Sequence, residues 1–192
     1  TYILPNPVKV ECYAKEEKKF KIVNVGRLTR QKNQKNLILA FCEVKKIFKN
    51  SELWIYGEGE LKGDLQSLCK SLDISNSVHF PGNVIDVHKR ICDASIFILS
   101  SDYEGQSNAL LEAMTMGLPC ISTKCAGATE IIEDGKNGFL VDVGNVSELI
   151  NAIKILFNND ALRNYIRKNA MNDLKKLDSN VISNEWYKII TH

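Results

Sequence analysis

The chain has no marked excess of either charge. Its 192 residues carry 25 basic and 23 acidic side chains, for a formal net charge of +2. Nucleic-acid-binding proteins usually show a much larger basic excess, so we expect no nucleic-acid partner. The sequence also lacks a secretion signal and any apolar run near the roughly 20 residues of a membrane-spanning helix. We therefore expect a cytoplasmic protein.

Histidine is scarce, and the cysteines lack the spacing of a metal site. The three histidines, His79, His88 and His192, do not cluster beside cysteines, and no Cys-x-x-Cys pair occurs. These absences argue against a zinc site. Several cysteines lie in apolar segments, which predicts free, buried thiols in a reducing cytosol. The six cysteines are Cys12, Cys42, Cys69, Cys92, Cys120 and Cys125.

Two familiar phosphate-binding motifs are missing. The chain contains no Walker loop, which disfavours NTP hydrolysis. The segment from Gly57 to Gly63 has the pattern Gly-x-Gly-x-x-x-Gly, one residue too long for a dinucleotide fingerprint. Its two glutamates, Glu58 and Glu60, would also repel a pyrophosphate. An NAD-dependent dehydrogenase is therefore disfavoured, and we interpret the segment as a tight strand-to-helix turn near a pocket.

What the chain does have is a regular alternation of short apolar runs and helical patterns. The expected strands are Lys21–Val25, Leu53–Tyr56, Val78–Phe80, Ser95–Leu99, Cys120–Ser122 and Gly138–Val141. The expected helices are Asn36–Phe48, Leu61–Leu72, Val84–Cys92, Ser107–Met116, Ala128–Glu133, Val146–Phe157, Ala161–Lys175 and Asn180–Ile190. This order predicts an α/β fold: a Rossmann-like, three-layer α/β/α domain with a mostly parallel sheet.

In such sheets, ligands bind beyond the carboxyl ends of the strands, so the loops after the strands are the candidate site. The loop that follows Leu99 carries the strongest signal. Ser107 is a good N-cap for the next helix, and the amides of Asn108, Ala109 and Leu110 would then be free to bind an anion such as a phosphate. Gly105 would allow backbone and ligand to approach closely.

Two glutamates accompany this helix. Glu104 lies in the loop, and Glu112 is the fifth helical residue if Ser107 is the cap. Because helical side chains lean toward the N-terminus, the Glu112 carboxylate can point to the helix mouth and accept two sugar or ribose hydroxyls. The alternative is a solvated stripe of Asn108, Glu112 and Thr115, and the spacing alone leaves both interpretations open.

The loop after Val25 is basic. Arg27, Arg30 and Lys32 crowd the mouth of the following helix, where they could neutralise a diphosphate. The alternative is an ordinary solvated basic loop, but its place after the first strand favours a functional role. Asp102 and Glu104 could hold magnesium, yet the helix end and the cations already supply positive charge, so we expect no metal.

Several blocks together carry a family resemblance. They are Gly26-Arg27-Leu28 with Lys32, Gly57-Glu58-Gly59, Glu104 to Met114, Gly117-Leu118-Pro119, Glu130-Ile131-Ile132, and Asn137 to Val141. In this order, over nearly the whole chain, they resemble the retaining, GT-B-fold glycosyltransferases of family four. The resemblance implies that residues 1–192 are the C-terminal, donor-binding domain of a two-domain enzyme. The N-terminal acceptor domain would then lie outside this chain.

The resemblance also implies roles for individual residues. Arg27 and Lys32 would hold the donor diphosphate, Glu104 would contact the transferred sugar, and Glu112 would contact the ribose. Arg27, Lys32 and Glu104 form the expected catalytic set, and the base would rest near Gly82. The expected donor-binding residues are Gly26, Gly57, Gly82, Asn83, Val84, Gly105, Ser107, Asn108, Ala109, Leu110 and Glu112. No cofactor is implied, and the donor would be a UDP- or GDP-sugar.

Within the family, the chain is most similar to bacterial enzymes that build capsule, O-antigen or other surface polysaccharides. The implied reaction is retaining transfer of a hexosyl unit from a nucleotide diphosphate sugar to a glycan or lipid-linked acceptor. Without the acceptor domain, the chain is expected to bind donor but transfer nothing. Peripheral binding at the inner face of the membrane, through that domain, stays open. The alternative is a non-catalytic nucleotide-binding or interaction module of the same fold.

Overall fold

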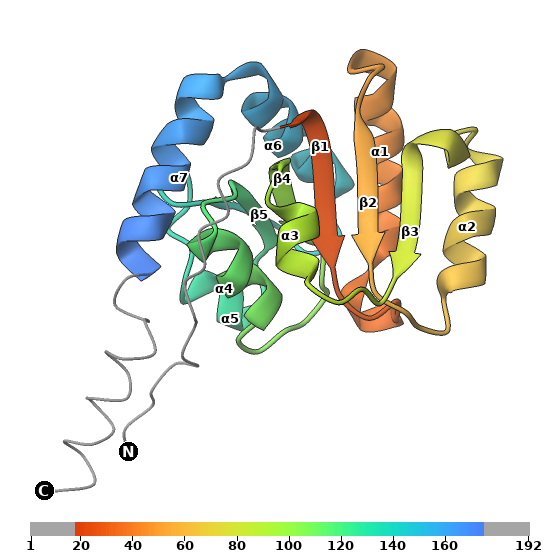
Figure 1. Ribbon diagram of the computed structural model, residues 1–192, viewed down its shortest axis with the longest axis horizontal. Helices are drawn as coiled ribbons and strands as arrows, with labels where there is room; N and C mark the ends of the chain where they lie inside the picture. The colour runs from red at the N-terminus through yellow and green to blue at the C-terminus, as the bar shows by residue number, and fades with distance from the viewer. Residues whose placement is uncertain (1–17, 175–192) are drawn as a thin grey trace, which may run out of the picture.

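The computed structural model describes residues 18–174, so the expected helix Asn180–Ile190 lies outside the described residues. Six parallel strands form one sheet in the order β3-β2-β1-β4-β5-β6 (Figure 1). The strands are β1 (Lys18–Val25), β2 (Glu52–Tyr56), β3 (Val78–Gly82), β4 (Ala94–Leu99), β5 (Cys120–Thr123) and β6 (Phe139–Val141). All six expected strands are present, and the sheet is parallel as predicted.

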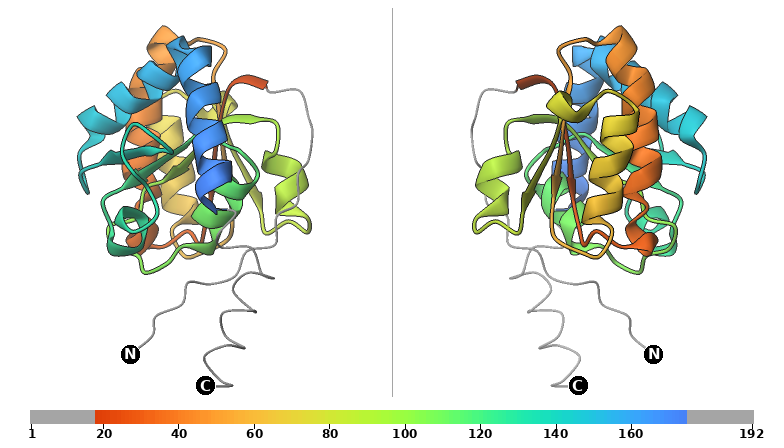
Figure 2. Two further views of the ribbon diagram at one scale, coloured as in Figure 1. Left: turned by 90° about the vertical axis from the view of Figure 1, so that its left-hand side faces the viewer. Right: turned by 90° about the vertical axis from the view of Figure 1, so that its right-hand side faces the viewer.

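Helices cover both faces of the sheet, which gives three layers (Figure 2). One face carries α1 (Gln34–Ile47), α2 (Lys62–Ser71) and α6 (Val146–Asn158), and the other carries α3 (Val87–Ile91), α4 (Asn108–Thr115) and α5 (Ala126–Thr129). The last described helix, α7 (Asp160–Leu174), packs against both α4 and α6. The Rossmann-like three-layer α/β/α fold is therefore confirmed.

Successive strand residues point to opposite faces of the sheet, and helices cover both faces, so both sets of side chains are buried. Ile22 and Ile96 pack into the core beneath α1 and α6, whereas Val23 and Phe97 pack into the core beneath α4. All six residues of β4 are buried. Because apolar side chains on both faces fix the strands, the loops that follow them are held in place at one edge.

Three local predictions need correction. The short helix expected at Ala128–Glu133 is α5, which ends at Thr129. It does not extend to Glu133, because the buried Asn137 side chain accepts from the Glu133 amide (2.8 Å) and donates to the Ile131 carbonyl (3.1 Å), in place of helical bonds. The turn that contains Asn137 is therefore anchored in the protein.

The other two corrections concern helix starts. The helix expected from Val84 begins at Val87, because Asp86 adopts a left-handed backbone conformation (φ 58°) that a helix cannot include. The helix expected from Asn36 begins at Gln34, and a short 3-10 helix, Arg30–Lys32, leads into it.

One buried ion pair ties α3 to the sheet. Lys21, on β1, pairs with Asp93 at the start of β4, and both side chains are nearly buried. The Lys21 ammonium also donates to the Arg90 carbonyl (2.9 Å). The Tyr56 hydroxyl donates weakly to the same carbonyl (3.5 Å), and burial, with a contribution from Asp93, raises the pKa of Tyr56 to about 12. This group fixes the short segment between α3 and β4.

The five cysteines of the described part are unpaired thiols, as expected, and Cys69, Cys120 and Cys125 are buried. Burial raises the pKa of Cys69 to about 11, so this thiol is not ionised at neutral pH. Within residues 18–174, no helix combines the length and apolar character that crossing a membrane requires.

Candidate functional site

The carboxyl ends of the parallel strands meet at one edge of the sheet, at the bottom of Figure 1. Backbone hydrogen bonds join the residues that leave these strands. The Gly26 amide donates to the Tyr56 carbonyl (2.9 Å), and the Gly57 amide donates to the Gly82 carbonyl (3.0 Å). The loops after β1, β2 and β3 therefore form one continuous surface.

A pocket of about 330 Å³ opens at this surface. It brings together six of the predicted site residues: Gly26, Arg27, Gly57, Gly82, Asn83 and Val84. Val25, Tyr56 and Val87 complete its lining. Since the exposed Arg27 and several apolar side chains, Val25, Val84 and Val87 among them, line the pocket together, it can hold a ligand that is part apolar and part anionic.

Position 57, which lines the pocket, requires glycine. This residue has φ +137°, and a Cβ built there would lie 2.1 Å from the carbonyl oxygen of Gly26. No side chain fits at that distance, and L-residues rarely adopt that backbone conformation. The tight turn predicted from the sequence is present, and its glycine serves the close approach of two loops.

Lys32 links the pocket to the loop after β4. Its side chain passes Gly26 closely enough that a Cβ on Gly26 would lie 3.5 Å from Lys32 Cδ. Its ammonium then forms an ion pair with Glu104, and both side chains are only 15% exposed. The Ser101 hydroxyl also donates to the Glu104 carboxylate (3.2 Å). Two residues of the predicted catalytic set, 72 positions apart, are therefore in contact.

Hydrogen bonds fasten the two loops around this pair. The Ser100 hydroxyl donates to the Lys32 carbonyl (2.8 Å). The Asp102 amide donates to the Gln31 carbonyl (2.8 Å), and the Gln31 side chain donates to the Tyr103 carbonyl (2.9 Å). The basic loop is therefore not a freely solvated one, because β4 holds it at the mouth of α4.

The start of α4 follows the prediction in part. Ser107 is the N-cap, and its hydroxyl accepts from the Leu110 amide (3.4 Å). The prediction of three free amides is therefore wrong for Leu110, whose amide the cap uses and whose side chain is buried. Asn108 is exposed and Ala109 is half-buried at the helix end, where the dipole favours negative charge.

Glu112 lies on α4, one turn further from the loop, and contacts a residue that the sequence did not single out. Its carboxylate is 3.0 Å from the Nε2 atom of His88 on α3, and each side chain is 37% exposed. The solvated-stripe interpretation is wrong for Thr115, which is buried and donates to the Glu112 carbonyl (2.8 Å).

The comparisons with known proteins agree with this arrangement. The family model described as glycosyl transferases group 1 matches residues 8–173. The chain belongs to this family. Its match extends over every strand of the sheet and over the loops that carry the pocket and the Lys32–Glu104 pair.

Individual relatives cover the same region. An uncharacterized glycosyltransferase of Haemophilus influenzae is 33% identical over 172 residues, which is 88% of this chain and 48% of that protein. A UDP-Gal:alpha-D-GlcNAc-diphosphoundecaprenol alpha-1,3-galactosyltransferase of Escherichia coli is 29% identical over 90% of this chain and 49% of its own length. The chain thus spans about half the length of these two relatives.

Among solved structures, TarM of S. aureus has the same fold. A mutant of TarM in complex with Fondaparinux, alpha-GlcNAc-glycerol and UDP superposes with a TM-score of 0.92 at 24% identity. That match covers 100% of this chain and 39% of the other. The open parallel sheet of this glycosyltransferase domain therefore matches one part of a GT-B glycosyltransferase structure.

The turn at residues 125–130 contacts the loop that carries Glu104. The Gly127 amide donates to the Glu104 carbonyl (3.3 Å), and a Cβ on Gly127 would lie 1.9 Å from the Gly105 oxygen. In this glycosyltransferase domain the turn therefore packs directly against the backbone of the Glu104 loop and supports it. At Gly105 itself, a Cβ would meet nothing within 4 Å, so packing within the described part of the domain does not require glycine there.

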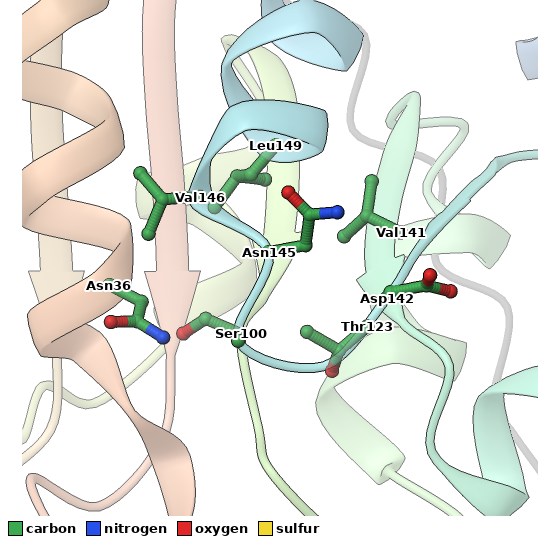
Figure 3. Close-up of a pocket in the computed structure, with 9 residues that line it drawn as sticks. Asn36, Ser100, Thr123, Val141, Asp142, Asn145, Val146 and Leu149 are labelled. Carbon is green, nitrogen blue, oxygen red and sulfur yellow. The ribbon is translucent and has the colours of Figure 1, made fainter.

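A second, much smaller pocket of about 10 Å³ lies between the start of α1 and the start of α6 (Figure 3). Asn36, Ser100, Thr123 and Asn145 are among the side chains that line it. This volume is about that of one water molecule and far below that of a nucleotide. The pocket beside Arg27 is therefore the better candidate for a donor site.

The described residues of the glycosyltransferase domain contain no group of three histidine, cysteine, aspartate or glutamate side chains placed to hold a metal. Asp102, considered as a magnesium ligand from the sequence, instead accepts from the Asn33 side chain (2.5 Å). The Asp102 and Glu104 carboxylates are thus both engaged with side chains of the loop after β1.

Proposed function

We propose that this chain is the donor-binding half of a retaining glycosyltransferase. The enzyme transfers a hexosyl unit from a nucleotide diphosphate sugar to a glycan or lipid-linked acceptor, in the synthesis of a bacterial surface polysaccharide. The observation that carries the proposal is the position of Lys32, which runs from the pocket wall at Gly26 to the Glu104 carboxylate. A cation and a sugar-binding carboxylate thus meet where a diphosphate and a sugar would join.

The site would promote the reaction by electrostatic stabilisation of the leaving group. When the bond from sugar to diphosphate breaks, negative charge grows on the departing phosphate oxygens. Arg27, Lys32 and the N-terminal end of α4 supply positive charge at that place, which stabilises the leaving group more than the bound substrate. Glu104 accepts hydroxyl hydrogens and orients the sugar. A diphosphate would also replace Glu104 as the main partner of Lys32.

The nucleotide and the acceptor are proposed from the relatives. The Escherichia coli galactosyltransferase is named for a UDP-sugar donor and a lipid-linked diphosphate acceptor. We propose a UDP-sugar as the first donor to test, with a GDP-sugar as the alternative. Because this chain matches only about half of that relative, we propose that an acceptor-binding domain in the rest of the protein completes the enzyme. No metal is needed, since the cations already balance the diphosphate.

The proposal predicts that nucleotide sugars stabilise the chain. Ligand at about 100 times its Kd adds about 2.7 kcal/mol to the free energy of unfolding. For a domain of this size, that raises Tm by roughly 5–10 °C. The measurement is a thermal-shift screen of UDP-, GDP- and ADP-sugars, with the free sugars as controls. If no nucleotide sugar shifts Tm by more than its free sugar does, the proposed function is wrong.

Binding alone does not separate an enzyme from a nucleotide-binding module, so a transfer assay follows. The longer protein is expected to transfer sugar from the donor that gives the largest shift, whereas the 192 residues alone are expected to bind that donor without transfer. Binding by the longer protein without transfer to any acceptor would favour the non-catalytic module.

A further inference from the structure

The contact between His88 and Glu112 joins two elements that follow different strands. His88 lies on α3, after β3, and Glu112 lies on α4, after β4. The Nε2 atom of His88 is 3.0 Å from Oε2 of Glu112, a hydrogen-bond distance. Both side chains remain partly open to solvent. The contact is therefore partly open to solvent, and Val87, the residue before His88, lines the pocket.

The backbone of His88 is held firmly for a surface residue. Val87 lines the pocket and packs on the core beneath α4, and Ile91 is 2% exposed. The Lys21 ammonium and the Tyr56 hydroxyl both donate to the Arg90 carbonyl at the end of the same short helix. Packing thus fixes the direction in which the imidazole leaves α3.

The backbone just before α3 adds a second constraint. Asp86 adopts φ 58°, a left-handed conformation that aspartate tolerates better than most residues other than glycine, and the preceding Ile85 is 90% exposed. A helix cannot include this conformation, so α3 begins after it. Here it starts the helix that presents His88 to Glu112.

A hydrogen bond to one carboxylate oxygen can hold the carboxylate while the other oxygen still accepts from a ligand. A free glutamate samples several rotamers, and a ligand must hold it in one of them at a cost in entropy. When the His88 N–H donates to Oε2, the carboxylate is held and Oε1 keeps its full capacity to accept from hydroxyls. This hydrogen bond requires the His88 tautomer that carries its proton on Nε2.

We propose that His88 is a positioning residue that holds the Glu112 carboxylate for the ribose hydroxyls of the donor nucleotide. This inference rests on the proposed function and on the ribose contact that the family resemblance implies for Glu112. It adds His88, a residue on α3, to the site. The effect of His88 passes through Glu112, so it concerns only ligands that carry ribose hydroxyls.

Titration calorimetry with two nucleotides tests the inference. The probes are UDP and 2′,3′-dideoxy-UDP, or their GDP counterparts if the chain prefers guanine. His88→Ala is expected to weaken UDP binding about three- to tenfold, as expected for losing one ordered side chain, and to leave dideoxy-UDP binding unchanged. His88→Gln, which can donate a similar hydrogen bond, is expected to recover most of the loss. In a chain that already carries Glu112→Ala, His88→Ala is expected to have no further effect.

A matched control is available in the second described histidine. His79 has similar exposure and packs on Trp54 at the sheet edge, so His79→Ala removes an imidazole without touching Glu112. It is expected to leave both affinities unchanged. Melting curves of every variant confirm that each is folded before titration.

The outcomes separate the two proposals. If wild type binds neither UDP nor GDP, the proposed function fails and this inference fails with it. If Glu112→Ala weakens UDP binding but His88→Ala does not, the proposed function stands and the inference is overturned. Equal loss for UDP and dideoxy-UDP in His88→Ala would also overturn it, because a purely structural contact acts on both ligands alike.

Discussion

Replacing Lys32 with alanine is expected to lower the turnover of the glycosyltransferase about 100- to 1,000-fold, the usual effect of removing one group that stabilises transition-state charge. Lys32 is the cation that joins the pocket to Glu104, and it is 15% exposed, so water screens its charge only partly. The measurement is kcat and KM of the longer protein with its nucleotide sugar. The loss should appear mainly in kcat, because charge on the diphosphate develops as the bond breaks.

The control is Arg30→Ala, which removes an exposed cation from the same loop and is expected to change kcat by less than about threefold. Arg27→Ala is expected to resemble Lys32→Ala. Glu104→Gln gives the opposite result in binding: UDP without a sugar should bind more tightly, since Lys32 loses its competing carboxylate, while turnover falls. Normal turnover in either Arg27→Ala or Lys32→Ala would contradict the leaving-group role.

Replacing Lys21 with methionine is expected to lower the free energy of unfolding by about 3–5 kcal/mol, because it leaves the Asp93 carboxylate in the protein without its lysine partner. Methionine has nearly the same length, so packing changes little. The same variant removes the donor to the Arg90 carbonyl (2.9 Å). Urea unfolding followed by circular dichroism gives the free energy, and a parallel loss of nucleotide affinity would show that α3 has shifted.

Lys46→Met is the matched control, since Lys46 pairs with Glu43 on α1 and its side chain is 64% exposed. Exposed pairs of this kind contribute less than about 1 kcal/mol. Adding Asp93→Asn to Lys21→Met is expected to recover part of the loss, because it removes the uncompensated charge. If Lys21→Met costs no more than Lys46→Met, the buried pair does not hold this part of the fold.

The sheet was predictable from the sequence because its strands are buried on both faces. A strand of that kind is a continuous apolar run, and β4 is the clearest case, with six buried residues in succession. The place of the candidate site followed from the same property, since parallel strands must all deliver their loops to one edge. The pocket beside Arg27 lies at that edge, as expected.

Contacts between loops that are distant along the chain could not be predicted from the sequence. The Lys32–Glu104 pair, the Asn137 bonds that end α5, and the approach of Gly127 to the Glu104 loop all depend on strand register and loop packing. None of them has a local pattern in the sequence. The small-residue run around Gly127 was a usable signal for close packing, whereas His88 had none, because one histidine on a short helix has no distinctive spacing.

A crystal structure of this chain with UDP tests the central claim most directly. The account predicts a diphosphate beside the Arg27 guanidinium and the Lys32 ammonium, with the N-terminal end of α4 at Asn108 facing the same phosphate oxygens. A diphosphate bound elsewhere, or an Arg27 side chain on the far side of the domain from the Asn108 amide, would contradict it.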